Sequence, residues 1–315
     1  MNKQQHFNQL LQNGKFAALA IDQGNSLKDI IKEKKGKTFK SSDYFFFKKQ
    51  IVLNLGVNTS SVLFDHETYL SDYSFKAIPT SKIIAYEDDA YNIDNKSRIT
   101  LLPKKLHQND EIIKDFSAIK FFMYFNPDSD ANINNEKFKL IKHVGQICKV
   151  LGMPYLFEPL LYYDERTKID YQSYLLKKPI YIKCLYQEFS KEEYQIDIIK
   201  IEFPFNEFEV NGFENDGNAS IYSYENCSEI IKECFEYNLK PFVFLSAGMK
   251  FNNFLHSLEL AKSSKIDFLG FLCGRSIWQD SIDIFCKSGQ DNFMDWINME
   301  GLQRVKKLKN VIIDN

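Results

Sequence analysis

The sequence lacks a strong bias in charge. Its 315 residues include 40 Lys and Arg against 42 Asp and Glu, for a net charge of −2. Proteins that bind nucleic acids or anionic membranes usually attract them with an excess of positive charge. One local basic run, residues 28–43, is interleaved with Asp29 and Glu33, and we expect it to form a solvated loop and helix start. We therefore expect neither a nucleic-acid partner nor a membrane partner.

Paired cysteines and long apolar runs are also missing. The six cysteines form no C-x-x-C pair and show no metal-finger spacing, which is typical of buried, reduced thiols in a reducing compartment. No stretch reaches the ~18 uninterrupted apolar residues of a membrane span, and residues 1–15 contain no apolar core of signal-peptide length. We expect a cytoplasmic protein.

The sequence offers little that could hold a metal or a dinucleotide. A catalytic metal needs several ligands at one place, but the five histidines, at positions 6, 66, 107, 143 and 256, do not cluster. No G-x-G-x-x-G follows the first predicted strand, which disfavours a dinucleotide-binding fold. We predict neither a metal site nor a cofactor.

What the sequence does contain is a regular alternation of strand and helix patterns. Stretches of helical period, such as 135–152, 228–240 and 251–264, separate the apolar runs of strand length. These runs span residues 16–22, 60–65, 82–87, 118–125, 154–162, 196–204, 241–247 and 267–275. Eight alternations favour a single-domain (β/α)8 barrel over residues 1–315, with an open doubly wound sheet as the alternative.

Charged residues interrupt several of these apolar runs. The segment YQIDIIKIEFPFN (194–206) places Lys200 and Glu202 two apart, so both should point to the same face of a strand. Burying an ammonium group costs several kcal/mol unless it is paired or used. Polar residues near the carboxyl ends of the predicted strands are Asp22, Asp65, Glu87, Lys120, Glu158, Lys200, Ser246 and Arg275. Any one of them could be an ordinary solvent-exposed strand end, but the three inside strands 4, 5 and 6 (Lys120, Glu158 and Lys200) predict a catalytic cluster in the barrel.

The chemistry of such a cluster is that of a Schiff-base enzyme. A neutral lysine amine can attack a ketone and form an iminium that weakens the adjacent carbon–carbon bond; desolvation and a second cation such as Lys120 favour the neutral form. Glu158 could transfer the protons. At the ends of strands 7 and 8, small residues beside a cation predict a phosphate site, unless the glycines only form tight turns: Ser246, Gly248, Gly274 and Arg275.

Five segments in order resemble the tagatose 1,6-bisphosphate aldolase family: LAIDQGNSLKDII, AIKFFMYF, IDIIKIEFPFN, FLSAG and GFLCGRSIW. That family consists of class I Schiff-base aldolases with a (β/α)8 barrel. The resemblance implies a Schiff base on Lys200, a second active-site lysine at Lys120 and proton transfer by Glu158. It also implies active-site roles for Asp22 and Gln23, and phosphate contacts from Ser246, Gly274 and Arg275. The implied reaction is metal-independent cleavage of a ketose 1,6-bisphosphate to dihydroxyacetone phosphate and glyceraldehyde 3-phosphate.

Two positions depart from the family pattern. Gly24 stands where the family usually has an arginine, and Pro159 after the glutamate resembles the related sulfofructose-phosphate aldolases. A sulfofructose-phosphate aldolase of the same mechanism is therefore an alternative, and a phosphosugar-binding regulatory barrel without turnover is a second one. The expected partner is a small sugar phosphate, and a homo-oligomer is compatible with this prediction.

Overall fold

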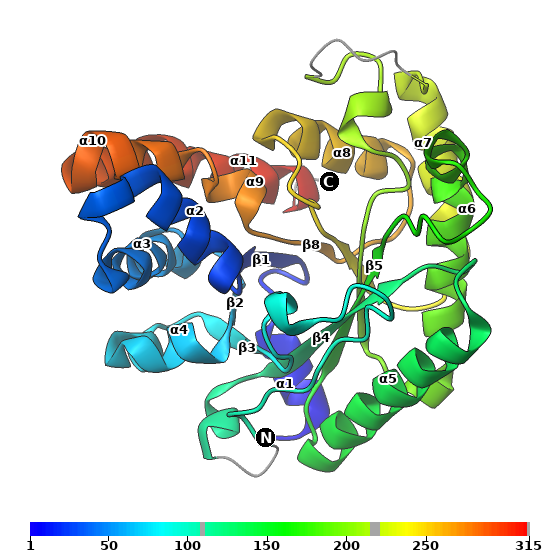
Figure 1. Cartoon of the computed structure of the whole chain (residues 1–315), viewed down its shortest axis with the longest axis horizontal. Helices are drawn as coiled ribbons and strands as arrows, with labels where there is room; N and C mark the ends of the chain where they lie inside the picture. Colours follow the sequence, from blue (N-terminus) through cyan, green and yellow to red (C-terminus); the bar gives the residue numbers. More distant parts are fainter. Residues whose placement is uncertain (108–110, 215–220, 314–315) are drawn as a thin grey trace.

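Eight parallel strands form a closed barrel in the computed structural model, which describes residues 1–107, 111–214 and 221–313 (Figure 1). Neighbouring strands pair in sequence order, and β8 pairs with β1, for example Leu272 with Ala18. The strands are β1 Phe16–Ala20, β2 Ser61–Phe64, β3 Ser81–Ala85, β4 Ala118–Phe125, β5 Tyr155–Leu161, β6 Ile198–Ile201, β7 Phe242–Phe244 and β8 Gly270–Cys273. The predicted barrel is confirmed, and the open doubly wound sheet is wrong because the two edge strands pair.

Helices surround the barrel (Figure 1). Their bounds are α1 Lys3–Gln9, α2 Asn25–Lys35, α3 Ser41–Asn54, α4 His66–Ser71, α5 Ala131–Leu151, α6 Tyr171–Phe189, α7 Tyr224–Phe235, α8 Phe251–Ser263, α9 Arg275–Trp278, α10 Ser281–Trp296 and α11 Leu302–Ile313. The predicted helix at 135–152 corresponds to α5, which ends at Gly152 in the left-handed conformation that favours glycine. None of the helices in the described ranges is long and apolar enough to cross a membrane.

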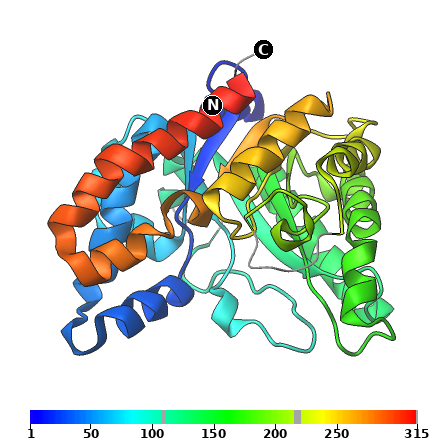
Figure 2. The ribbon, with the colours of Figure 1, turned by 90° about the horizontal axis from the view of Figure 1, so that it is seen from above.

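One connection departs from the simple alternation. Between β3 and β4 the described residues form no α-helix, only the short 3-10 turns η4 Ala90–Asn92 and η5 Glu111–Asp115. In Figure 2 this connection is the cyan loop that projects beyond the barrel at lower centre. Its first residues, Asp88 and Asp89, line the cavity described below.

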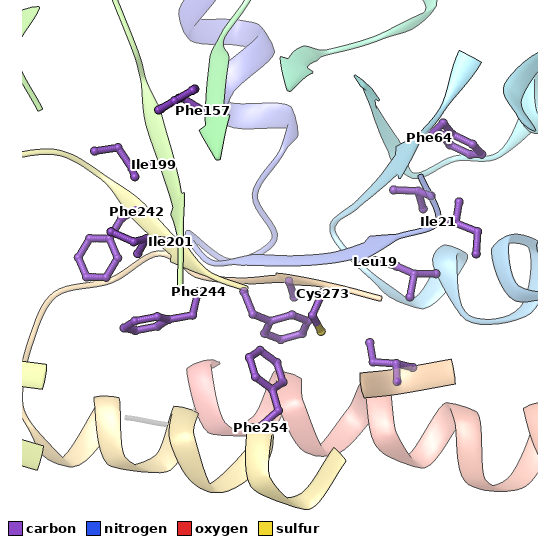
Figure 3. Packing of buried hydrophobic residues seen from close by; sticks show 14 of the residues in the cluster. Leu19, Ile21, Phe64, Phe157, Ile199, Ile201, Phe242, Phe244, Phe254 and Cys273 are labelled. Carbon is purple, nitrogen blue, oxygen red and sulfur yellow. The ribbon is translucent and has the colours of Figure 1, made fainter. Parts of the chain in front are cut away.

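Side chains alternate between the two faces of each strand, which is the basis of the site. Figure 3 shows Ile199, Ile201, Phe242 and Phe244 outside the barrel, with Phe254 of α8 facing the strands. The intervening residues form a separate apolar cluster inside the barrel: Phe16, Ala18, Ala20, Leu63, Ile83, Ala85, Ala118, Leu156, Ile198, Val243 and Leu272. Because strand side chains repeat every two residues, the next inward positions lie at the carboxyl end of the barrel.

The amino end of the barrel is closed by the start of the chain. Leu10, which follows α1, is buried in the interior cluster with Phe7 and Leu11 packed against it. The hydroxyl of Ser61 on β2 donates to the carbonyl of Leu10 (2.9 Å). Closure at this end leaves the carboxyl end as the place where a substrate can enter, as in other barrels of this type. The extent of the single domain over residues 1–315 stays a prediction.

Candidate active site

A cavity of about 1300 Å³ opens at the carboxyl ends of the strands. Eight of the nine residues predicted for the site line it: Asp22, Gln23, Lys120, Glu158, Lys200, Ser246, Gly274 and Arg275. The ninth, Gly248, is not among the lining residues. Residues that are far apart in the sequence therefore meet in one cavity, which is more than large enough for a small phosphorylated sugar.

Lys120 of β4 is the centre of a buried charge cluster. Its ammonium nitrogen lies 2.8 Å from Oε2 of Glu158, 2.6 Å from Oε1 of Glu87 and 3.3 Å from Oδ2 of Asp22. The Nζ atom of Lys200 lies 2.8 Å from the other oxygen of Glu158. One carboxylate therefore bridges the two lysines, and the side chains of Lys120 and Lys200 are only 3% and 6% exposed.

The strand alternation explains why these five side chains meet. Each one stands two residues beyond a residue of the apolar interior cluster, on five different strands or just past their ends. The pairs are Ala20 and Asp22, Ala85 and Glu87, Ala118 and Lys120, Leu156 and Glu158, and Ile198 and Lys200. The apolar cluster fills the barrel up to that level, and the charged layer forms the floor of the cavity.

The electrostatics of the cluster favour ionised groups at its centre. Burial alone would lower the pKa of Lys120, but the charges of Glu158, Glu87 and Asp22 outweigh it and hold the pKa well above its usual value. Burial alone would raise the pKa of Glu158, but Lys120 and Lys200 hold it below its usual value. The pKa of Asp22 is lowered in the same way, with burial opposing the two lysines. Lys120 is therefore a permanent cation, and Glu158 and Asp22 are carboxylates near neutral pH.

Glu87 is the member of the charge cluster that the sequence did not predict as a site residue. Its side chain is 6% exposed, contacts Lys120 and accepts a hydrogen bond from the backbone N–H of Phe122 (3.2 Å). Burial raises its pKa to about 7, because Lys120 offsets only part of the desolvation. The sequence does contain a signal for Glu87, which is one of the polar residues near the carboxyl ends of the predicted strands. It follows the strand instead of interrupting an apolar run, so the pattern did not single it out.

Glu202 does not share a face with Lys200, contrary to the sequence-based expectation. β6 ends at Ile201, so the alternation of a regular strand does not extend to Glu202. Glu202 forms an ion pair with Lys178 of α6 (3.4 Å), whereas the carboxylate that contacts Lys200 is Glu158 of the neighbouring strand. The partner of the buried lysine thus lies 42 residues away in sequence, beyond what a local pattern can indicate.

Gln23 is positioned by its backbone. Its carbonyl accepts hydrogen bonds from Nζ of Lys48 (2.8 Å) and from the hydroxyl of Tyr44 (3.0 Å), both on α3. Its side-chain nitrogen donates to Oδ1 of Asp22 (3.2 Å). Its Oε1 is buried and has no hydrogen-bond partner among the residues that the structure describes. A buried acceptor without a partner is costly. A hydroxyl group of a bound ligand could satisfy it.

The predicted phosphate site surrounds an exposed arginine. Ser246 is buried just beyond β7, and Arg275 follows Gly274 at the end of β8. Gly248 has a φ of +84°, and a Cβ there would lie 3.3 Å from the Cζ atom of Arg275. Glycine at 248 thus provides both the left-handed turn and the space for the guanidinium, so it acts next to the cavity and not in its wall.

The two departures from the family pattern lie in different places. Pro159 is buried one residue beyond Glu158, on the opposite face of β5, and is not among the residues that line the cavity. Gly24 does line it, directly after Gln23. Within residues 1–107, 111–214 and 221–313, no group of three or more His, Cys, Asp or Glu side chains is placed to hold a metal ion.

Comparisons with known proteins agree with this geometry. The model of the DeoC/LacD family aldolases matches residues 16–280, which include all five strands of the charge cluster and the predicted phosphate site. The chain belongs to the DeoC/LacD aldolase family. It is therefore an aldolase, and the resemblance to the tagatose 1,6-bisphosphate aldolases is confirmed.

Curated relatives match this DeoC/LacD family member over nearly its full length. The tagatose 1,6-diphosphate aldolase of Listeria monocytogenes is 29% identical over 299 residues, covering 95% of this chain and 88% of the relative. The tagatose 1,6-diphosphate aldolase 1 of Enterococcus faecalis is 30% identical over 314 residues, covering 98% and 94%. Among solved structures, a Plasmodium falciparum fructose-bisphosphate aldolase superposes with a TM-score of 0.75 at 13% identity, covering 98% of this chain and 93% of that one. The similarity to the Plasmodium falciparum structure shows that the two proteins share a fold.

Proposed function

We propose that this protein is a metal-independent class I aldolase. In this proposal it cleaves the C3–C4 bond of a ketose 1,6-bisphosphate through a Schiff base on Lys200. The substrates are tagatose 1,6-bisphosphate, which the names of the relatives suggest, and fructose 1,6-bisphosphate. The products are dihydroxyacetone phosphate and glyceraldehyde 3-phosphate. The observation that carries the proposal is the carboxylate of Glu158, which bridges two buried lysines.

The unequal surroundings of the two lysines support Lys200 as the nucleophile. Among the described residues, Lys120 forms ion pairs with three carboxylates, whereas Lys200 forms one with Glu158. Only a neutral amine can attack a ketone. Lys120, whose pKa lies well above its usual value, stays charged, which leaves Lys200 as the candidate nucleophile. Lys120 then stabilises the negative charge that develops beside it.

Glu158 is placed to move the protons of this reaction. At 2.8 Å from Nζ of Lys200, it can help protonate and remove the C2 oxygen as water while the iminium forms. The iminium then draws the electron pair of the C3–C4 bond toward C3, and Glu158 takes the proton of the C4 hydroxyl as the aldehyde leaves. Protonation of C3 and hydrolysis of the iminium release dihydroxyacetone phosphate and restore the lysine.

The substrate's 1-phosphate belongs, in this proposal, at Arg275 and Ser246. Backbone N–H groups beyond β7 and β8 and a guanidinium suit a phosphate dianion. A phosphate held there places C2 within reach of Lys200 on the adjacent β6. Pro159 points away from the cavity and therefore gives no support to a sulfonated substrate. Such a substrate is included in the test below.

The test is reductive trapping with a panel of ketose phosphates. The protein is incubated with tagatose 1,6-bisphosphate, fructose 1,6-bisphosphate or sulfofructose 1-phosphate, then treated with borohydride and weighed by intact-protein mass spectrometry. We expect a covalent adduct with the bisphosphates and release of dihydroxyacetone phosphate without borohydride. Absence of any adduct together with absence of cleavage would refute the aldolase mechanism. Trapping and turnover of the sulfonated sugar alone would reassign the substrate.

A further inference from the structure

The wall opposite the predicted phosphate site decides what the far half of the substrate can carry. This inference rests on the Schiff-base mechanism of the proposed function and narrows its substrate from ketose 1,6-bisphosphates to ketose 1-phosphates. In a ring of eight strands, β3 and β4 lie across from β7 and β8. A ketose held by its phosphate at Arg275 and by C2 at Lys200 therefore extends its distal carbons toward the ends of β3 and β4. Asp88 and Asp89, after β3, and Phe122 and Tyr124, on β4, line the cavity there.

Asp89 is a fixed part of this wall. Its Oδ2 accepts the backbone N–H of Asn25 (2.8 Å), and its Oδ1 accepts that of Tyr91 (3.0 Å). A Cβ atom at position 24 would lie 2.1 Å from Oδ2 of Asp89, closer than any non-bonded contact allows. With Asp89 in this position the residue at 24 must be glycine, and a larger side chain there would have to displace the Asp89 carboxylate from its backbone hydrogen bonds.

The cations of the cavity are already paired, with one exception. Among the lining residues in the described ranges, every lysine is in an ion pair: Lys34 with Asp283, Lys104 with Asp88, Lys105 with Glu67, Lys120 with its three carboxylates and Lys200 with Glu158. Among the lysines and arginines that line the cavity in the described part of the chain, Arg275 alone has no ion-pair partner. Nearby Arg98 is not a lining residue, and its guanidinium stacks on the rings of Tyr124 and Tyr162.

A second phosphate would gain little from such a wall. It would lie near the carboxylate of Asp89 and would have to detach a lysine such as Lys104 from Asp88 to find a positive charge. The charge of Asp89 would repel it, and the exposed side chains of Lys104 and Lys105 offer only the weak attraction of solvent-screened ion pairs. A hydroxyl group at the same place is not repelled by Asp89 and needs no lysine to leave its ion pair, and it can donate a hydrogen bond to the Asp89 carboxylate.

We propose that the cavity binds one phosphate, that of C1, and that Asp89 makes the distal subsite specific for an uncharged, hydroxylated chain. Ketose 1-phosphates are then cleaved at least as well as their 1,6-bisphosphates. The C3–C4 bond breaks, its electron pair passes to C3, and the C4 hydroxyl proton passes to Glu158. The products are dihydroxyacetone phosphate and an uncharged aldehyde, glyceraldehyde in the case of a hexose.

The experiment compares substrates that differ only at the distal carbon. The kcat/KM values of the full-length protein are measured for tagatose 1-phosphate against tagatose 1,6-bisphosphate, and for the two fructose phosphates, by following dihydroxyacetone phosphate. We expect the 1-phosphate to be cleaved at least as well as the bisphosphate in both pairs, within the error of the measurement. A preference for the bisphosphate beyond that error in either pair would overturn the proposal. Absence of cleavage and of borohydride adducts with all four sugars would instead refute the aldolase mechanism itself.

A charge-neutral variant isolates the role of Asp89. The substitution Asp89→Asn removes the negative charge and keeps an oxygen that can accept a backbone N–H. We expect it to shift the kcat/KM ratio toward the bisphosphate by threefold or more. The matched control is Asp94→Asn in the same loop, where the carboxylate also accepts backbone N–H groups, from Lys96 and Ser97, but does not line the cavity. An unchanged ratio in Asp89→Asn, or an equal shift in Asp94→Asn, would contradict a specificity role for Asp89.

Discussion

Replacing Glu87 by glutamine should stabilise the protein more strongly at pH 8 than at pH 5. The Glu87 carboxyl is buried beside Lys120, and its pKa is raised from 4.5 to about 7, because desolvation exceeds the attraction of the ammonium group. Between these two values the folded protein binds a proton at Glu87 that the unfolded chain does not. The stability of the native protein therefore falls as the pH rises through this window, whereas a glutamine contributes no such loss.

The magnitude follows from the two pKa values. A shift of this size corresponds to a free-energy difference on the order of 3 kcal/mol, of which about 2–3 kcal/mol should develop between pH 5 and pH 8. The side chain is 6% exposed, so screening by solvent should reduce this value little. Compared with a total stability of about 5–15 kcal/mol, the effect is large enough to measure.

The assay is urea denaturation of wild type and Glu87→Gln at pH 5, 6, 7 and 8. The control is Glu136→Gln on α5, an exposed glutamate that contacts Lys139 and should give nearly the same difference from wild type at every pH. The reasoning predicts that the difference between Glu87→Gln and wild type grows across the series. A constant difference, or one that shrinks with pH, would show that the Glu87 carboxyl is ionised throughout and would refute the argument.

Three further predictions concern activity. Arg275→Ala should lower kcat/KM for a 1-phosphorylated ketose, because it removes a charge-assisted contact; the expected loss of transition-state stabilisation is on the order of 2–4 kcal/mol. An unchanged kcat/KM would place the phosphate elsewhere. Activity should survive EDTA, because the proposed mechanism uses lysine chemistry, and loss of activity that zinc restores would contradict it. Tagatose and fructose 1,6-bisphosphates should differ by less than roughly tenfold in kcat/KM, since no fixed cation grips the distal half; a strong preference for one C4 epimer would show that other residues hold it.

The fold and most of the charge cluster could be predicted because they depend on local patterns. Strand side chains alternate with a fixed period, so a lysine or glutamate inside an apolar run points into the barrel if its apolar neighbours face the helices. That reasoning located Lys120, Glu158 and Lys200 in the cavity. It failed at Glu202, because the strand ends one residue earlier, at Ile201, and the Glu202 side chain pairs with Lys178 of α6.

Other features depend on contacts between segments that the sequence does not relate. Glu87 lies past the end of its strand, and its pKa is raised by burial and, to a smaller extent, by the charges of Asp22 and Glu158, which come from other strands. Gly24 packs against the carboxylate of Asp89, which is 65 residues away in the sequence. Asp89 lies in the connection between β3 and β4, where the alternation of strand and helix predicts an α-helix. The sequence does not reveal that Gly248 provides space for Arg275, and its predicted phosphate contact stays a prediction. The catalytic and binding roles of these residues stay predictions.

The most direct test of the account is the position of the covalent bond. Wild type, Lys200→Arg and Lys120→Arg are incubated with dihydroxyacetone phosphate, reduced with borohydride, digested and mapped by mass spectrometry. The account predicts a reduced adduct on Lys200 in wild type, none in Lys200→Arg, and an adduct still on Lys200 in Lys120→Arg, where the guanidinium keeps a cation beside Glu158. An adduct on Lys120 in wild type, or one that persists on another lysine in Lys200→Arg, would contradict it.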